Sequence, residues 1–268
     1  MILQAIEMSY HNSVRNVSRI STGARTLDTI LYGGVETSAI TQFYGDSSSG
    51  KTQLCHTICS IVSQDEHKGG IKGKAIYLDT EGTYRPERIV QIARARGFDS
   101  DKTLESIIPY EIHDTAEQEL IIEKEVNIHL KENQKDNENN FKLLVIDSPI
   151  THFRSEYIGR AKLPERQQRL FRFMRNLTKL AQRFRIAVVV TNQVNTVPDI
   201  LNTKKAVGGS VMNHVVTYSI HLQNRFGSSK CYSAQIVSSP YHPQCETIFK
   251  VSEKGVTDIY QVDPSRKK

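Results

Sequence analysis

The chain has 268 residues, of which 38% are hydrophobic, enough for a substantial core, and it carries a net charge of +6 at neutral pH. It has no run of about 18 apolar residues to cross a membrane and no basic-then-apolar signal at its start, so an intracellular protein without membrane contact is expected. The four cysteines lie in no zinc-binding spacing and are predicted to be reduced. The positive charge favours an acidic partner, with nucleic acid the natural candidate, but also fits an ordinary solvated surface.

The first recognisable elements surround a glycine-rich motif. A short helix is expected over residues 21–31 and a strand over 39–44. Residues 45–52 then read GDSSSGKT, a complete match to the phosphate-loop pattern GxxxxGKT, and a helix is predicted over 53–62. Because a strand, a glycine loop and a helix N-terminus together form an anion site, the segment predicts nucleotide binding rather than a chance match in a serine-rich turn.

The individual positions of this loop suit phosphate chemistry. Gly45 and Gly50 permit the tight turn, Lys51 would reach the outer phosphates, and the Thr52 hydroxyl would ligate Mg²⁺. The predicted nucleotide-binding segment is therefore Gly45, Asp46, Ser47, Ser48, Ser49, Gly50, Lys51, Thr52 and Gln53.

The middle of the chain alternates strands and helices, and its end is rich in strands. Strands are predicted over 75–79, 143–147 and 186–193, and helices over 85–96, about 116–131 and from Pro164 onward. The last of these helices has an apolar stripe along one face, which is predicted to be core. The polar tract 132–140 is predicted to be a solvated loop. Three β-rich segments follow, over 217–225, 231–239 and 246–252. The pattern predicts an α/β fold with a mostly parallel central sheet flanked by helices and a C-terminal antiparallel extension.

Two carboxylates near strand ends complete the expected site. Asp147 ends an apolar strand and would be an acid of the outer coordination shell of the magnesium ion beside Thr52. Glu81 follows another buried strand and could orient the attacking water, because ligand groups in open α/β sheets lie at the carboxyl ends of strands. Each residue is also compatible with an ordinary solvent-facing acid at a strand end.

These motifs together resemble those of the RecA/RadA-type recombinases, and more closely the archaeal and eukaryotic branch than the bacterial one. The similarity runs from about Ile20 to Ile259 and rests on the phosphate loop, DTEGTYRPER at 79–88, TNQV at 191–194 and two glycines at 208–209. The resemblance implies a RecA-like P-loop ATPase core over residues 21–268, preceded by a linker and assembly segment over residues 1–20.

The resemblance also assigns roles to residues. Glu81 would activate water, with Lys51 and Gln193 as further catalytic groups, and Asp147 would be the acid of the metal site. Arg88 would stack on adenine, and His214 would join Gln193 in reporting the γ-phosphate to two DNA-binding loops. The first loop would lie at about residues 154–162 and the second at about 194–207. The predicted DNA contacts are Arg154, Arg160 and Lys162 in the first loop and Lys204 and Lys205 in the second.

The implied function is that of a DNA-dependent ATPase that uses ATP and Mg²⁺. It would bind single-stranded DNA, pair it with a homologous double-stranded partner and exchange strands in recombinational repair. It would self-associate as a filament or ring, or form a heteromer, and would be DNA-associated in the nucleus of a eukaryote or the cytoplasm and nucleoid of a prokaryote. Two alternatives stay open: a recombinase paralogue that assists another recombinase, and a non-hydrolysing nucleotide-dependent scaffold.

The chain departs from the family pattern where neighbouring subunits would meet. The helix-hairpin-helix domain has no counterpart, by truncation or by nature, and residues 2–5 (ILQA) are only a weak version of the usual anchor. Bulky or polar residues replace the small alanines of the receiving pocket, and serines replace an ATP-capping aspartate and an aromatic residue of the phosphate loop. The chemistry of the nucleotide site is therefore expected to be retained and the assembly of subunits to be altered. The departing positions are Ser47, Pro109, Glu111, His113 and Ser238.

Overall fold

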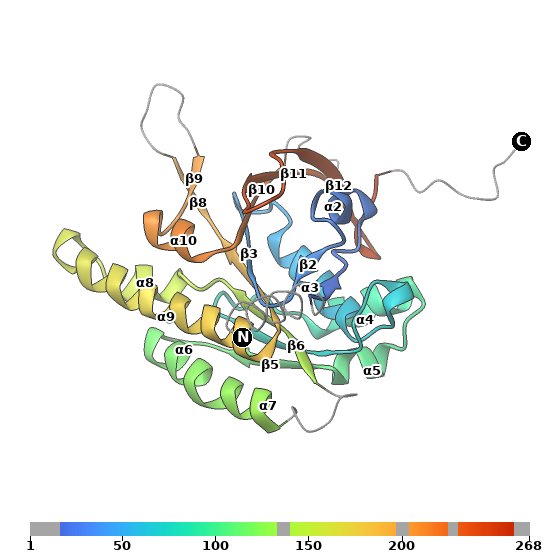
Figure 1. The fold of residues 1–268 in the computed structure, drawn as a ribbon, viewed down its shortest axis with the longest axis horizontal. Helices are drawn as coiled ribbons and strands as arrows, with labels where there is room; N and C mark the ends of the chain where they lie inside the picture. Colours follow the sequence, from blue (N-terminus) through green and yellow to red (C-terminus); the bar gives the residue numbers. More distant parts are fainter. Residues whose placement is uncertain (1–16, 133–139, 197–203, 225–229, 260–268) are drawn as a thin grey trace, which may run out of the picture.

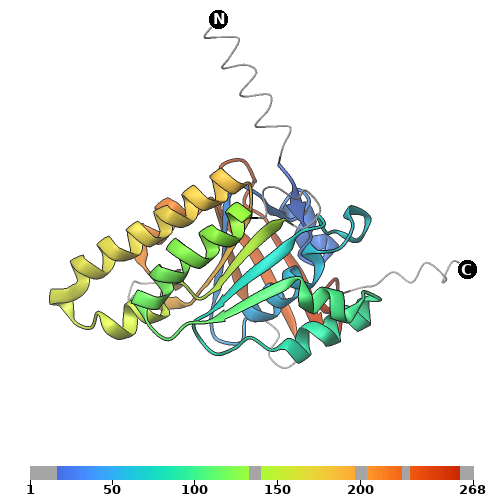
Figure 2. The same ribbon diagram turned by 90° about the horizontal axis from the view of Figure 1, so that it is seen from below.

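The computed structural model describes residues 17–132, 140–196, 204–224 and 230–259. A nine-stranded sheet organises this part of the chain, with the order β13-β12-β11-β10-β3-β7-β6-β4-β5 (Figure 1). Helices cover both of its faces, as the second view shows (Figure 2). The predicted α/β fold is confirmed.

The parallel part of the sheet is built from short apolar strands. Every pair of neighbours among them runs in the same direction, from β10 at one side to β5 at the free edge. Because both faces are covered, the strands lack the alternation typical of a half-exposed sheet. Their bounds are β3 Ile40–Gly45, β4 Lys74–Asp79, β5 Ile107–Glu111, β6 Phe141–Asp147, β7 Ala187–Asn192 and β10 Tyr218–Gln223.

The C-terminal extension is antiparallel, as predicted. Strand β10 pairs in parallel with β3 and antiparallel with β11 (Cys231–Ser238), so the direction changes at β10. The extension continues through β12 (Glu246–Ser252) to β13 (Gly255–Thr257). Strand β13 was not predicted, because three residues are too few to show a periodic pattern.

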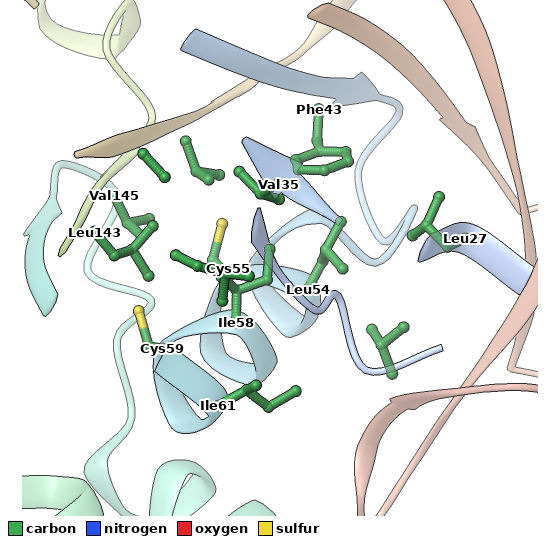
Figure 3. Close-up of a cluster of buried hydrophobic side chains, with 14 of the residues drawn as sticks. Leu27, Val35, Phe43, Leu54, Cys55, Ile58, Cys59, Ile61, Leu143 and Val145 are labelled. Carbon is green, nitrogen blue, oxygen red and sulfur yellow. The ribbon is translucent and has the colours of Figure 1, made fainter. Parts of the chain in front are cut away.

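One face of the sheet is covered by α2 (Arg25–Ile30), α3 (Lys51–Val62), α4 (Pro86–Arg96) and α5 (Ser100–Glu105). Figure 3 shows Leu54, Cys55, Ile58, Cys59 and Ile61 of α3 among side chains of the sheet and of α2. Both of these cysteines are fully buried and free, in agreement with the prediction of reduced thiols. Helix α3 is therefore anchored by its apolar face, which fixes the phosphate loop at its start.

The other face is covered by longer helices. The predicted helix over 116–131 is α6 (Thr115–Ile121), a π-helical segment η2 (Ile122–Val126) and α7 (Asn127–Glu132), a continuous run whose π-helical part the periodicity did not reveal. Beside it lies α9 (Leu163–Phe184), whose predicted apolar stripe is buried. Three further short segments complete this part: α8 (Thr151–Glu156), a 3-10 helix η4 (Arg160–Lys162) and α10 (Gly209–Val215).

The remaining regular elements are small. Strands β1 (Arg19–Ile20) and β2 (Val35–Glu36) form one antiparallel pair, β8 (Val194–Thr196) and β9 (Lys204–Ala206) form another, and η1 is a 3-10 helix over Glu66–Lys68. None of the helices in the described ranges is long and apolar enough to cross a membrane. Most of the polar tract 132–140 and of the segment 1–20 lies outside the described residues, so the loop and linker predictions there stay predictions.

Candidate functional site

A cavity of about 400 Å³ opens where the central parallel strands end. The phosphate loop follows β3, Glu81 follows β4, Asp147 ends β6 and Gln193 follows β7. Four segments far apart in the sequence thus meet at the carboxyl ends of the parallel strands, as the parallel topology requires. The residues lining the cavity are Ser47, Ser48, Ser49, Gly50, Lys51, Thr52, Gln53, Glu81, Thr83, Gln193 and Tyr232.

The phosphate loop has the backbone that its glycines predicted. Gly50 adopts a left-handed conformation with φ of 91° immediately before α3. Gly45 lies against β10, where an added Cβ would be 2.2 Å from the carbonyl oxygen of Leu222. Only glycine fits such a close approach of two backbones.

Lys51 lies inside the loop. Its Nζ donates hydrogen bonds to the carbonyl oxygens of Asp46 at 2.7 Å and Gly45 at 3.0 Å. Burial lowers the pKa of the Lys51 ammonium, and the carboxylates of Asp147 and Glu81 oppose this shift. The loop therefore presents a cation, backbone N–H groups and a helix N-terminus to one cavity, which is the arrangement that holds polyphosphates.

Thr52 and Asp147 are adjacent, as predicted for a metal site. The Thr52 hydroxyl donates to Asp147 Oδ2 at 2.7 Å, and the carboxylate is almost completely buried. Hydroxyl and carboxylate oxygens are the ligands that Mg²⁺ prefers, so the donor set fits that ion. No group of three or more His, Cys, Asp or Glu side chains in the described ranges could hold a metal ion.

Glu81 reaches into the cavity from an exposed loop. Its Oε1 accepts hydrogen bonds from Thr151 Oγ1 at 3.0 Å and from Gln193 Nε2 at 3.2 Å. The loop itself is held by buried Asp79, whose carboxylate accepts the backbone N–H groups of Glu81 at 3.1 Å and Tyr84 at 2.8 Å. Two of the three predicted catalytic groups, Glu81 and Gln193, are thus in direct contact.

Arg88 lies beside Gln53, the residue that follows the phosphate-loop motif. Its Nε donates to Gln53 Oε1 at 2.8 Å, and its terminal nitrogens donate to the backbone oxygens of Ser252 and Glu253 and to the side chain of Gln91. Burial lowers the pKa of the guanidinium. The contacts fix the plane of the group between α3, α4 and the turn after β12, a geometry compatible with stacking on a base.

Gln193 connects the cavity to the predicted second DNA loop. The Gln193 carbonyl accepts the Val207 N–H at 3.0 Å, and Asn192 Nδ2 donates to the Val207 carbonyl at 2.7 Å. These bonds close the base of the β8–β9 ribbon, which carries Lys204 and Lys205 in β9. The side chains of these two lysines lie outside the described part. His214 is exposed in α10 and does not line the cavity.

The predicted first DNA loop is mostly helical. Arg154 lies in α8, and Arg160 and Lys162 lie in η4 at the start of α9. All three residues are exposed, and none of them forms an ion pair within the described residues. Their charges are therefore available to an anionic partner.

Several residues at the site were not among the predicted site residues. Thr151 and Asp79 hold Glu81 or its loop, and Thr83 and Tyr232 line the cavity. Tyr232 comes from β11 and packs its ring on Phe249, with ring centres 5.5 Å apart. Asp79 had a usable signal, a carboxylate at the end of a buried strand, and Thr83 lies in the same motif at 79–88. Thr151 and Tyr232 reach the site only because distant segments meet there.

Comparison with known proteins agrees with this geometry. The Rad51 family model matches residues 13–259. The chain belongs to the Rad51 family. The Rad51-family relatives include the DNA repair and recombination protein RadA of Cenarchaeum symbiosum, 40% identical over 260 residues, which are 95% of this chain and 63% of the relative. RadA of Aeropyrum pernix is 40% identical over 245 residues, which are 91% of this chain and 74% of that relative. The predicted resemblance is confirmed.

The five positions predicted to depart from the family pattern lie on the surface. Pro109 and Glu111 are exposed on β5, the edge strand, and His113 is exposed just after it. Ser238 is exposed at the end of β11, and Ser47 is an exposed residue of the cavity wall. An altered assembly surface stays a prediction.

Proposed function

We propose that the protein is an ATP-dependent DNA recombinase, with ATP hydrolysis at the cavity coupled to the binding of DNA by two loops. The observation that carries the proposal is the contact of Glu81 with Gln193, because Gln193 also closes the base of the β8–β9 ribbon. A change at the γ-phosphate would thereby alter a segment that carries two lysines. The names of the RadA relatives favour this function over the accessory paralogue.

In this proposal each group has a defined task. Lys51 and the loop N–H groups hold the phosphates, and Thr52 and Asp147 would hold Mg²⁺, which when bound offsets negative charge on the phosphates. Glu81 would orient and accept a proton from the attacking water, because its carboxylate is exposed in the cavity and two donors fix its Oε1. Arg88 would contact adenine. The retained carboxylate disfavours a non-hydrolysing scaffold.

The cations of the two loops would contact the DNA backbone. Arg154 in α8 and Arg160 and Lys162 in η4, just before α9, present exposed charges. Phosphate contacts carry no sequence information, which suits an enzyme that accepts any DNA. We infer single- and double-stranded DNA as ligands and DNA-associated sites as the place of action. Self-association would follow the family, through a surface altered at Pro109, Glu111, His113, Ser47 and Ser238.

The decisive experiment measures strand exchange between a labelled duplex and homologous single-stranded DNA, alongside phosphate release. The purified protein should do both with ATP and Mg²⁺, and Lys51→Ala should lose both, whereas Glu81→Gln should still bind nucleotide but release phosphate at least about 100-fold more slowly. The control is Lys72→Ala, an exposed lysine remote from the cavity. Folded protein that binds ATP but shows neither exchange nor DNA-stimulated phosphate release would refute the proposal.

A further inference from the structure

The Asp147 carboxylate accepts hydrogen bonds from three hydroxyl groups of the described residues. Its Oδ2 accepts from Thr52 at 2.7 Å and from Tyr77 at 3.0 Å, and its Oδ1 accepts from Thr191. Thr52 belongs to the phosphate loop, but Tyr77 and Thr191 are fully buried in the neighbouring strands β4 and β7 and do not line the cavity. The two strand residues therefore contact the carboxylate from within the sheet.

The position of the Tyr77 hydroxyl is fixed by the packing of its ring. The ring lies in the core between α3 and the sheet, with the ring of Tyr84 5.0 Å and that of His56 5.8 Å away. Tyr84 belongs to the loop that carries Glu81, since its N–H is bound by Asp79. Tyr77 thus contacts both Asp147 of the proposed metal site and the ring of Tyr84 in the Glu81 loop.

A carboxylate needs such support because its terminal torsion is broad. Rotation about the Cβ–Cγ bond is restricted only weakly by the side chain itself. Donors on both oxygens remove this freedom, and hydrogen bonds to a charged acceptor are the stronger ones. Among the described residues, Tyr77 is the donor on Oδ2 that is not itself a proposed metal ligand, so without it Oδ2 is held by the Thr52 hydroxyl alone.

We propose that Tyr77 is a positioning residue of the magnesium site, whose buried hydroxyl holds the Asp147 carboxylate with Oδ2 against Thr52. The proposal rests on the proposed nucleotide site, because it concerns the metal that accompanies the nucleotide. Tyr77 would not touch the ion or the phosphates itself. It would act through Asp147, and its loss should weaken binding that depends on Mg²⁺ while leaving metal-free binding intact.

The test is Tyr77→Phe, which removes the hydroxyl and keeps the ring. Binding of a fluorescent ADP analogue is titrated with the full chain at increasing Mg²⁺ concentration and, separately, in EDTA. The Mg²⁺ concentration for half-maximal binding should rise about 10-fold, the equivalent of one hydrogen bond to a charged group. Affinity in EDTA should change less than about twofold. In an Asp147→Asn background, Tyr77→Phe should have little further effect, because the group through which it acts has been altered.

The matched control is Tyr218→Phe. Tyr218 is also a buried tyrosine with a hydrogen-bonded hydroxyl, but it lies at the opposite end of β10 from Leu222, the residue that pairs with Gly45. An unchanged Mg²⁺ requirement in Tyr77→Phe, an equal loss of affinity in EDTA, or a failure to fold would overturn the proposal. Wild-type protein that binds no Mg²⁺–ADP would instead refute the nucleotide site, so the two failures are distinguishable.

Discussion

The substitution Asp79→Asn should disturb the loop that carries Glu81 without weakening the binding of nucleotide. Asp79 is 5% exposed and accepts two backbone N–H groups, one on each oxygen, from Glu81 and Tyr84. Asparagine offers only one acceptor oxygen, and its NH₂ group would face the second N–H. One buried donor is then left without a partner, at a cost of about 1–3 kcal/mol in the free energy of unfolding.

The larger effect is expected on catalysis. A displaced loop moves the Glu81 carboxylate away from Gln193 and Thr151, and a misplacement of about 1 Å can lower a rate roughly 100-fold. Nucleotide binding should change little, because Lys51, Thr52 and Gln53 have no contact with Asp79 among the hydrogen bonds of the described residues. We therefore expect kcat for ATP hydrolysis to fall strongly while the affinity for ADP stays within about threefold.

Steady-state phosphate release, titration of a fluorescent ADP analogue and urea unfolding together check this expectation. The control is Asp99→Asn, which alters an exposed carboxylate that also accepts two backbone N–H groups, at the start of α5 and away from the cavity. Asparagine is a good helix cap, so this control should remain close to wild type. A kcat within twofold of wild type in Asp79→Asn, or a parallel loss of ADP affinity, would refute the reasoning.

Three further outcomes follow from the structure. Burial and the nearby charges of Arg88 and Arg85 lower the pKa of His56 to about 4. Protonation of His56 therefore favours the unfolded state, and the free energy of unfolding should fall by about 3 kcal/mol as the pH drops from 6.5 to 4. Urea unfolding of His56→Phe across this range should lack this loss, and a pH profile identical to that of the wild type would contradict the assignment. Replacing Arg154, Arg160 and Lys162 by Gln should reduce the slope of log affinity against log salt concentration for single-stranded DNA by about 0.7 per charge removed. Fluorescence anisotropy measures this slope, with Lys72→Gln/Lys102→Gln as the control. An unchanged slope would contradict the assignment of the first DNA loop. Leu177→Ala should destabilise the fold by about 2–5 kcal/mol because Leu177 is fully buried in α9, whereas exposed Lys179→Ala should cost less than about 0.5 kcal/mol in the same urea titration.

The phosphate loop and the apolar stripe of α9 were predictable because their signals are local. Consecutive residues specify the tight turn from Gly45 to Thr52, and a helical repeat of apolar residues specifies which face of α9 is buried. The short elements were not predictable in the same way. Helices α5, α8 and α10 have six or seven residues each, too few for a periodic pattern to stand out.

The sequence by itself determined which groups are proposed for the chemistry of the site. The strand, glycine loop and helix around Lys51 predict a polyphosphate, and carboxylates at the ends of apolar strands predict groups at one edge of a parallel sheet. These inferences hold because bonded neighbours and the direction of parallel strands leave few alternatives.

Only the tertiary structure decided how these groups are held. Tyr77 lies 70 residues from Asp147 in the chain, and Gln193 lies 112 residues from Glu81, yet each pair is joined by a hydrogen bond. Sheet order brings β4, β6 and β7 side by side, and no local pattern encodes which hydroxyl then meets which carboxylate. The residues proposed to perform the chemistry can thus be identified in the sequence, whereas those that position them depend on the packing of distant segments.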